Sequence, residues 1–496
     1  MRHIIGIYSK FIKNNIAFML TFTLLLSAQL LYLKVAISPD EAFYLFHADS
    51  ILSGSFAQND PWQVGFYPVF YSILALISLI FGKSIIISRL ILFIINGLNA
   101  IVLFKIGSDF WDIKVGKISS ILYLIGILMP AFESHYVLTE PLMLFFGLIG
   151  IYLFLKCDRG IYLILSGVLF SLSSLCKTIG LLYIVSIGLY FIFNLRDVKN
   201  QNGKYIISSI KKMSLEIFGY IIPIFIGYLY FNHIDSVSTY FVFGMSRFMS
   251  VYEHEFVISL LNDIFMSSSI IWIFSLVTMC TFGYDYIYNK YNKKNLFILI
   301  CFFVSLYPLS TRQFGHYFIP ILPFACILSS LCIMNNIQKL KFELIREAFI
   351  KKDDFKIFAL LCIIGMLVFS FVFNLRVGNE NLKGGYSLYD EQLKTSNYIK
   401  AHTSETDKIF VLGYEPSIYY LSGREPPVNI FIFNQYYYNE TVENEIINKL
   451  KNDSIYIIIP PGGKTDDAGK NIERFVKNNY QLKESIGGYN IYSRVT

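Results

Sequence analysis

The chain has 496 residues, of which 55% are hydrophobic and only 16% are charged. Soluble domains usually carry about 25% charged residues, so the composition excludes an ordinary soluble protein and predicts a multi-pass protein of the cell membrane. The net charge of +7 does not indicate nucleic-acid binding, because the Lys and Arg residues cluster in short loops between apolar runs.

Apolar runs of membrane-spanning length recur through the first three quarters of the chain. The first follows three basic residues and is too long for a signal peptide, so we interpret it as a retained helix. A shorter run, 66–81, either spans the membrane or lies in its interface. The other runs predict about eleven transmembrane helices, at residues 16–37, 85–104, 115–130, 139–155, 161–176, 178–194, 215–231, 265–286, 295–309, 317–334 and 357–375.

The distribution of basic residues favours eleven spans over twelve. If 66–81 does not span, each inside loop carries Lys or Arg, whereas the outside loops carry only Lys83, Arg247 and Arg312. Cytoplasmic loops are the ones enriched in Lys and Arg. The pattern therefore predicts a cytoplasmic N-terminus and an extracytoplasmic C-terminus, with outside loops at 38–84, 131–138, 232–264 and 310–316.

The last part of the chain differs in kind. Residues 377–496 alternate short apolar runs (KIFVLGY, VNIFIFN, SIYIIIPP) with amphipathic stretches such as YDEQLKTSNYIKAH. This alternation predicts a small α/β domain, which ends in a hairpin with Gly487-Gly488 at its turn. We therefore expect a transmembrane domain at 1–376 and an extracytoplasmic soluble domain at 377–496.

The first outside loop opens with adjacent carboxylates, Asp40 and Glu41, directly after a hydrophobic span. A carboxylate pair at this boundary indicates a functional site, with a general base or metal ligand as its role. The alternative is structural, because Ser38-Pro39-Asp40-Glu41 is also a favourable helix start. The two interpretations are compatible, since a cap position also holds a carboxylate rigidly.

The second outside loop carries Glu133, His135 and Glu140 in FESHYVLTEPLML. Its position on the same side of the membrane predicts that these side chains approach Asp40. Thr139-Glu140-Pro141 is again a helix start, so a capping role for Glu140 stays open. Glu133 and His135 have metal-ligand character and are the candidates for a divalent ion, although one Glu and one His are a weak metal pattern.

Several cationic and hydrogen-bonding side chains are predicted at the same membrane face. Lys177 interrupts an apolar stretch of more than 30 residues, Arg89 lies early in the second span, and Arg312, His316 and Tyr317 lie at the last outside loop. Any one of these cations taken alone would be interpreted as a residue that extends to the interface. Together they indicate a site for the phosphate of an anionic lipid.

A base at the membrane boundary and cations for a phosphate suit group transfer from a lipid phosphate to an acceptor. The carboxylate takes the proton of an acceptor hydroxyl, while Lys, Arg or a divalent ion balances the charge of the leaving phosphate. A single displacement of this kind is the pattern of inverting glycosyl chemistry.

Several segments, in their order, resemble the membrane-embedded GT-C glycosyltransferases. The resemblance is closest to the branch that contains the protein O-mannosyltransferases and the lipid A 4-amino-4-deoxyarabinose transferase. It is carried across residues 15–335, and a further stretch near residue 400 resembles the outer tail of bacterial members. The segments are SPDEAFY, FYPVFYSILALISLIFGKSIIISRL, YVLTEPLMLFF, SLCKTIGLL, RQFGHYFIPILPF and YIKAHTSETDKIFVLGYEPSIYYLSGREPP.

The resemblance implies a polyprenyl-phosphate-linked sugar donor, an extracytoplasmic active site and inversion at the sugar carbon. The acidic pair of the family falls on Asp40 and Glu41, with Asp40 as the base, and its lysine falls on Lys177. Its second-loop acid, usually Asp, falls on Glu140. The Arg-Tyr of the family is separated here as Arg312…His316-Tyr317, and its double proline is reduced to Tyr67-Pro68. These departures argue against a close relationship with either named enzyme.

The sequence thus predicts an inverting glycosyltransferase that moves a hexosyl or pentosyl group to an extracytoplasmic lipid, glycan or protein. The main alternative is a transporter or flippase of lipid-linked sugars. Transporters usually place charges at mid-membrane and often contain internal repeats, and the sequence has neither feature. A cell-surface polysaccharide polymerase or ligase usually relies on an outside loop rich in Arg and His, and the loop 232–264 has one Arg and two His.

Overall fold

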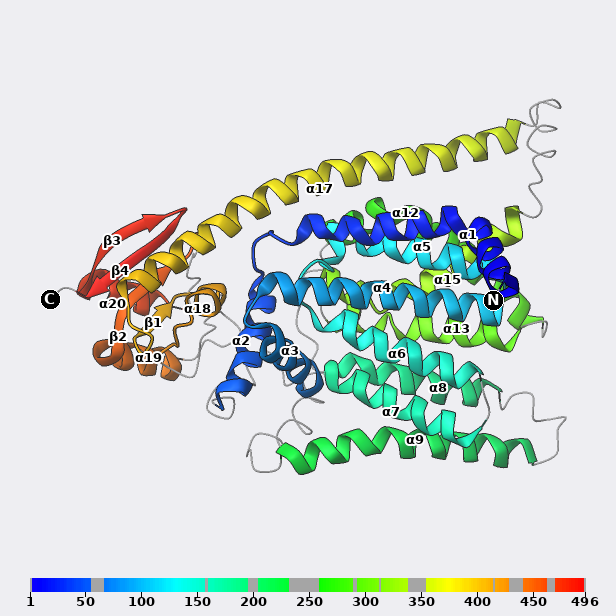
Figure 1. Ribbon diagram of the computed structural model, residues 1–496, viewed down its shortest axis with the longest axis horizontal. Coiled ribbons are helices and arrows are strands. Elements are labelled where there is room, and N and C mark those ends of the chain that lie inside the picture. The colour runs from blue at the N-terminus through cyan, green and yellow to red at the C-terminus, as the bar shows by residue number, and fades with distance from the viewer. Residues whose placement is uncertain are drawn as a thin grey trace. The chain divides into compact units, whose positions relative to one another are not determined.

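The computed structural model describes residues 2–54, 67–156, 159–194, 204–231, 258–288, 292–311, 314–337, 354–413, 415–427, 440–461 and 469–494. Most of these residues are helical (Figure 1). The helices that precede the C-terminal sheet are α1 (Arg2–Ala28), η1 (Gln29–Tyr32), α2 (Pro39–Ser53), α3 (Pro68–Phe81), α4 (Ile85–Phe110), α5 (Ile113–Ile127), η3 (Pro130–Phe132), α6 (Thr139–Lys156), α7 (Gly160–Cys176), η4 (Thr178–Gly180), α8 (Leu181–Asn194), α9 (Lys204–Phe231), α12 (Ile258–Ile287), α13 (Lys293–Val304), α14 (Tyr307–Thr311), η7 (Gly315–Phe318), α15 (Leu322–Ile337) and α17 (Asp354–His402).

Each of the eleven predicted spans overlaps at least one helix of the structure, although 295–309 covers both α13 and α14. Among the described residues, five helices are long and apolar enough to cross a membrane: Asn15–Tyr32, Ile85–Phe110, Thr139–Lys156, Ile206–Leu229 and Leu261–Ile287. The ambiguous run 66–81 forms α3, whose 14 residues extend about 21 Å. Two of the predicted spans are no longer, since α8 has 14 residues and α13 has 12, so helix length does not distinguish α3 from them. The number of spans and their orientation stay predictions.

The chain divides into two compact units. The first unit comprises Met1–Leu31, Leu90–His135 and Thr139–Asn379, and the second comprises Tyr32–Arg89, Tyr136–Leu138 and Glu380–Thr496. The predicted boundary between a transmembrane domain (1–376) and an extracytoplasmic domain (377–496) stays a prediction. The helix α17 runs without a break from Asp354 to His402, so the stretch YDEQLKTSNYIKAH, predicted as an amphipathic helix, forms its C-terminal part.

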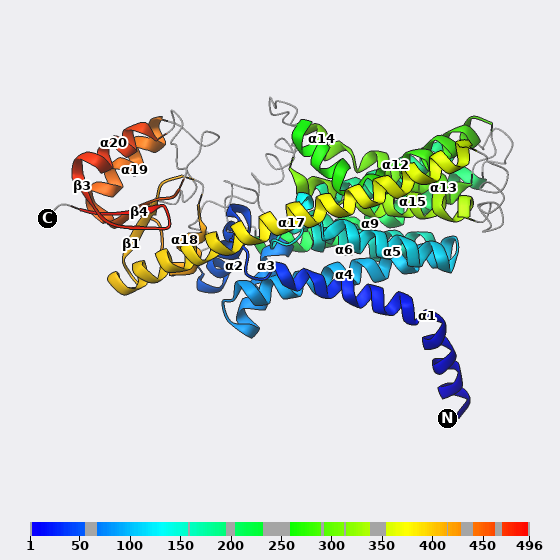
Figure 2. The ribbon, with the colours of Figure 1, turned by 90° about the horizontal axis from the view of Figure 1, so that it is seen from above.

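The first unit is a bundle in which long helices run side by side (Figures 1 and 2). Helix α7 packs between α6 and α9, and α15 packs against α5 and α12. The α7–α9 crossing depends on glycine, because a Cβ on Gly167 would meet the Glu216 carbonyl oxygen at 2.1 Å, and one on Gly219 would meet that of Ile164 at 2.1 Å. Small residues allow helix backbones in membranes to approach this closely.

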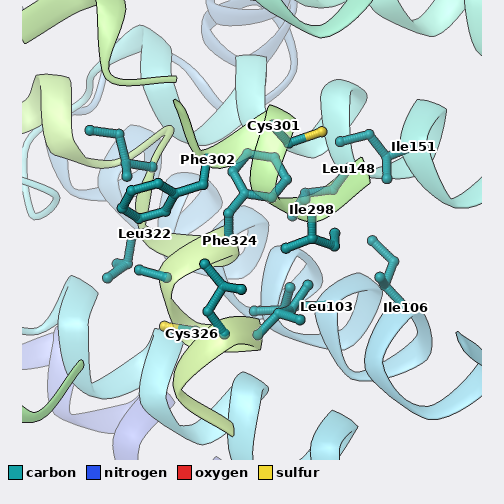
Figure 3. Packing of buried hydrophobic residues seen from close by; sticks show 14 of the residues in the cluster. Leu103, Ile106, Leu148, Ile151, Ile298, Cys301, Phe302, Leu322, Phe324 and Cys326 are labelled. Atoms are coloured by element: carbon teal, nitrogen blue, oxygen red, sulfur yellow. The ribbon is translucent and has the colours of Figure 1, made fainter. Parts of the chain in front are cut away.

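A large apolar cluster forms the centre of the first unit. Its central side chains come from α4, α6, α13 and α15 and interdigitate closely (Figure 3). Burial of apolar surface within such a core contributes about 25 cal/mol per Å² when the reference is water. The labelled members are Leu103, Ile106, Leu148, Ile151, Ile298, Cys301, Phe302, Leu322, Phe324 and Cys326.

The second unit contains a four-stranded mixed sheet in the order β1-β2-β4-β3. Strand β1 pairs parallel with β2, whereas β4 pairs antiparallel with both β2 and β3. The predicted hairpin is confirmed, with Gly487 and Gly488 at positive φ between its strands. The predicted strand in VNIFIFN lies outside the described residues. The elements are β1 (Lys408–Val411), α18 (Ser417–Ser422), α19 (Glu440–Asp453), β2 (Ser454–Ile459), α20 (Lys470–Asn479), β3 (Tyr480–Ile486) and β4 (Tyr489–Arg494).

Candidate active site

The helix α2 begins with a capping box, as the sequence Ser38-Pro39-Asp40-Glu41 predicts. The Ser38 hydroxyl accepts a hydrogen bond from the Glu41 amide at 3.2 Å, and the Glu41 carboxylate accepts one from the Ser38 amide at 3.4 Å. Two amides that a helix start leaves unpaired are thereby satisfied. The structural interpretation of this stretch is therefore correct for Glu41, and it fixes the backbone on both sides of Asp40.

The Glu41 carboxylate also forms a completely buried ion pair with Arg89 of α4. Arg89 donates from Nε to Oε1 at 2.9 Å and from Nη2 to Oε2 at 2.5 Å, and both side chains are 0% exposed. The Val137 amide donates a third hydrogen bond to Oε1, at 2.8 Å. Two-point binding of this kind is the strongest arrangement of a carboxylate with a guanidinium.

The other donors of Arg89 are directed at the backbone that precedes α2. Nη1 donates to the carbonyls of Leu33 and Val35 at 3.0 and 2.8 Å and lies 3.3 Å from that of Tyr32, and Nη2 donates to Ala36 at 3.0 Å. A guanidinium has five N–H donors, so protein acceptors occupy all of them. The predicted span 16–37 is too long, because α1 ends at Ala28 and η1 at Tyr32, and Arg89 binds the carbonyls of the non-helical backbone that follows.

Asp40 differs from its neighbour in burial, because its side chain is partly exposed. It occupies the second position of α2, between Pro39 and Glu41, and is partly exposed. The positive end of a helix dipole favours a carboxylate there. The two members of the acidic pair therefore have different surroundings: Glu41 is buried in an ion pair with Arg89, and Asp40 is partly exposed at the start of the same helix.

Aromatic side chains of α2 and α3 pack against one another. Tyr44 lies edge-on to Phe70 at 5.3 Å, and His47 lies edge-on to Phe43 at 4.2 Å and tilted against Tyr71 at 5.4 Å. All five side chains are buried. Burial lowers the pKa of His47 to about 3, so this imidazole is neutral at physiological pH and forms part of the packing between α2 and α3.

A second cluster lies in the first unit, where Glu140 meets Lys177. Glu140 stands in the first turn of α6 and Lys177 follows the last residue of α7, where the backbone is extended. Their side chains form an ion pair and are 0% and 5% exposed, respectively. The Thr139 hydroxyl donates to the Glu140 carboxylate at 3.1 Å, and the Lys177 ammonium lies 4.5 Å from the ring centre of Tyr317.

His316 connects this ion pair to a second carboxylate. Its Nδ1 lies 2.6 Å from Glu133 Oε2, and its Nε2 lies 3.8 Å from Glu140 Oε1. The Glu133 side chain is 39% exposed, so the cluster reaches from a buried carboxylate to an accessible one. The contact requires glycine at position 315, because a Cβ there would meet the Ala131 carbonyl oxygen at 1.9 Å.

The structure thus gathers most of the predicted site residues into two groups. Glu133, Glu140, Lys177, His316 and Tyr317 belong to the first unit, and Asp40, Glu41 and Arg89 belong to the second. Arg312 lies outside the described residues. Glu133, one of the two predicted metal ligands with His135, instead hydrogen-bonds to His316. Within the described ranges, no group of three or more His, Cys, Asp or Glu side chains could hold a metal ion.

Sequence reasoning missed the role of Arg89 and the contribution of the Val137 amide. The capping-box pattern was a usable signal for Glu41, because Glu three residues after Ser often bonds back to the helix start. No local pattern connects Glu41 with Arg89, which lies 48 residues later.

No protein-family model and no curated protein matches this chain. Several solved structures are similar to it. ArnT from Cupriavidus metallidurans bound to undecaprenyl phosphate has 11% identity and a TM-score of 0.60, with 98% of each chain covered. The apo state of the same protein has 11% identity and a TM-score of 0.61, with 96% of this chain and 97% of that chain covered.

The archaeal oligosaccharyltransferase AglB from Archaeoglobus fulgidus, in complex with an inhibitory peptide and a dolichol-phosphate, is also similar. It has 14% identity and a TM-score of 0.55, with 96% of this chain and 74% of that chain covered. At these identities the likeness concerns the fold. The chain has the GT-C fold that its sequence resemblance implies, and it is a membrane protein with several spans.

Proposed function

We propose that this protein is an inverting glycosyltransferase that moves a sugar from a polyprenyl-phosphate donor to an extracytoplasmic acceptor. The observation that carries the proposal is the different environment of two adjacent carboxylates, Asp40 and Glu41, in a chain that has the GT-C fold. The Glu41 carboxylate is buried in an ion pair with Arg89, whereas Asp40 lies in the first turn of a helix and is partly exposed. A general base needs that combination of rigid placement and accessibility.

In the proposed reaction Asp40 acts on the acceptor. Its carboxylate removes the proton from an acceptor hydroxyl as the oxygen attacks the anomeric carbon of the donor. The bond from that carbon to the phosphate oxygen breaks, and its electron pair leaves with the polyprenyl phosphate. One displacement from the face opposite the leaving group inverts the configuration at the sugar carbon.

Lys177 is proposed to stabilise the leaving phosphate. Its ammonium carries three N–H donors and is held by Glu140 and the Tyr317 ring in a largely buried setting, where electrostatic interactions are stronger than in water. His316, hydrogen-bonded to the partly exposed Glu133, is a second donor for the same phosphate. Arg89 acts as a positioning residue in this proposal, because its donors are directed at Glu41 and the backbone.

The extracytoplasmic placement of the reaction rests on the distribution of Lys and Arg among the loops, which puts the first loop outside. ArnT with bound undecaprenyl phosphate and AglB with bound dolichol-phosphate, both of this fold, support a lipid-linked donor. The experiment below would identify the sugar and the acceptor.

The test compares the wild type with Asp40→Asn, each purified and shown to be folded by size exclusion. Radiolabelled polyprenyl-phosphate sugars are offered as donors, with a membrane extract as the source of acceptor. We expect the wild type to transfer one label, and Asp40→Asn to bind the donor but turn over roughly 10²–10⁴-fold more slowly. Asp109→Asn, which alters a surface pair with Lys105 at 3.3 Å, is the charge-matched control and should retain activity.

Equal transfer by wild type and Asp40→Asn would show that Asp40 only stabilises the first turn of α2. Movement of lipid-linked sugar across vesicles, without any transfer of label, would make the protein a flippase and overturn the proposal.

A further inference from the structure

The segment before α2 is held from a second direction by the C-terminal part of α17. Gln392 accepts a hydrogen bond from the Ile37 amide at 2.9 Å and donates one to the Ile37 carbonyl at 3.0 Å. The Ala36 amide donates to the Gly385 carbonyl at 2.8 Å. One side chain thus satisfies both backbone groups of the residue that stands three positions before Asp40.

The approach of the two segments is close. A Cβ on Gly385 would lie 3.0 Å from the Cβ of Val35, so a larger residue there would push the segment away. Gln392 is completely buried, and Ile37 is 2% exposed. Buried backbone groups must be paired, and at Ile37 the pairing comes from a residue 355 positions later in the chain.

Gln392 is itself held in place. Its Nε2 also contacts Glu415 Oε1 at 3.2 Å, and the Ser417 hydroxyl donates to the same oxygen. Ser417 begins α18, which packs against α2. The start of α2 therefore lies between Arg89, which binds its carbonyls and Glu41, and a second set of contacts built entirely from residues after position 380.

We propose that Gln392 is a positioning residue for Asp40, which makes the segment that follows residue 380 part of the catalytic apparatus. The inference rests on the proposed function, because it assigns Asp40 the role of base. Without Gln392 the Ile37 backbone loses both partners, and the Ser38–Glu41 turn shifts relative to the acceptor. A displacement of about 1 Å at a reacting group can cost roughly 10²-fold in rate.

The test uses the full-length protein with Gln392→Met, which keeps the length of the side chain but removes both hydrogen bonds. We expect kcat to fall about 10- to 100-fold, while the KM for the polyprenyl-phosphate sugar stays within about twofold, because Gln392 touches no donor group in the proposal. Hydrogen exchange at the Ile37 amide should become faster. Gln481→Met, at an exposed position of β3, is the matched control and should leave both values unchanged.

A double-mutant cycle with Asp40→Asn separates positioning from general stability. If Gln392 acts through Asp40, Gln392→Met should have almost no further effect in the Asp40→Asn background. Fully additive losses, or an unchanged kcat in the single variant, would overturn the inference while leaving the proposed function intact. Full activity of Asp40→Asn would instead overturn the assignment of the base.

A second variant guards against misfolding. Gln392→Glu keeps an acceptor for the Ile37 amide but loses the donor to its carbonyl, so we expect a loss of kcat smaller than that of Gln392→Met. A loss as large in Gln481→Met as in the Gln392 variants would contradict the inference.

Discussion

Two buried pairs of a carboxylate and a cation, Glu41–Arg89 and Glu140–Lys177, differ in the hydrogen bonds that the cation makes. Each carboxylate stands in the first turn of a helix, and each side chain is almost or completely buried. Arg89 binds its carboxylate through two nitrogens and uses its other donors on backbone carbonyls. Lys177 hydrogen-bonds to Glu140 through its single ammonium nitrogen, which lies 4.5 Å from the ring centre of Tyr317.

The difference teaches how to distinguish a structural charge pair from a chemical one. A planar guanidinium suits several fixed acceptors at once, whereas an ammonium is a point charge that can exchange partners. Around the Glu41–Arg89 pair, four backbone carbonyls lie within hydrogen-bonding distance of the guanidinium, and the Val137 amide donates to the carboxylate. The Glu140–Lys177 pair continues through His316 to Glu133, whose side chain is 39% exposed.

The largest effect, on stability, is expected from substitutions that disrupt the Glu41–Arg89 pair. Arg89→Lys keeps the charge but provides three donors in place of five, and removal of one partner from a buried pair costs about 3–5 kcal/mol. We expect Arg89→Lys and Glu41→Gln each to lower the unfolding temperature sharply in detergent. The surface variant Asp109→Asn should lower stability by less than about 1 kcal/mol. Unchanged unfolding of Arg89→Lys would remove the distinction between the two pairs.

An intermediate effect, on activity rather than stability, is expected at the Glu140–Lys177 pair. Lys177→Met leaves the buried Glu140 unpaired, so the double variant Glu140→Gln/Lys177→Met is the informative one. Removing both charges should restore most of the unfolding temperature, while kcat stays roughly 10²–10³-fold low for lack of the phosphate-binding ammonium. Recovery of activity together with stability would show that Lys177 is structural, like Arg89.

The smallest effect concerns Glu415, a carboxylate that is held by the neutral donors Gln392 and Ser417 rather than by a cation. Loss of hydration raises the pKa of its carboxyl from 4.5 to about 7. The folded state thus keeps a proton that the unfolded chain releases, and the stability this gives is complete below pH 4.5 and lost as the pH rises through about 7.

Glu415→Gln mimics the protonated form and should remove this dependence. We expect wild type and variant to unfold at similar temperatures near about pH 5, and the variant to unfold a few degrees higher near about pH 8. Thermal unfolding at the two pH values measures the difference. Parallel curves for the two proteins would contradict the raised pKa.

The sequence by itself determined the helices and the local chemistry of their ends. Apolar runs located all eleven predicted spans on helices, because burial in a bilayer requires about 20 apolar residues in a row. The alternation near the C-terminus indicated the strands, and Gly487-Gly488 indicated the turn of the hairpin, because only glycine adopts positive φ without cost. The residue types around Asp40, Glu140 and Lys177 also marked the two clusters of charged side chains, one in each unit.

Only the tertiary structure decided which of these charges are partners. Glu41 and Arg89 are 48 residues apart, Glu133 and His316 are 183 apart, and Ile37 and Gln392 are 355 apart. Periodicity and capping rules act over a few residues, whereas the pairing of buried polar groups depends on which helices pack together. The buried Arg89 therefore resembled a phosphate ligand in the sequence, and the structure assigns its donors to Glu41 and to the backbone that carries Asp40.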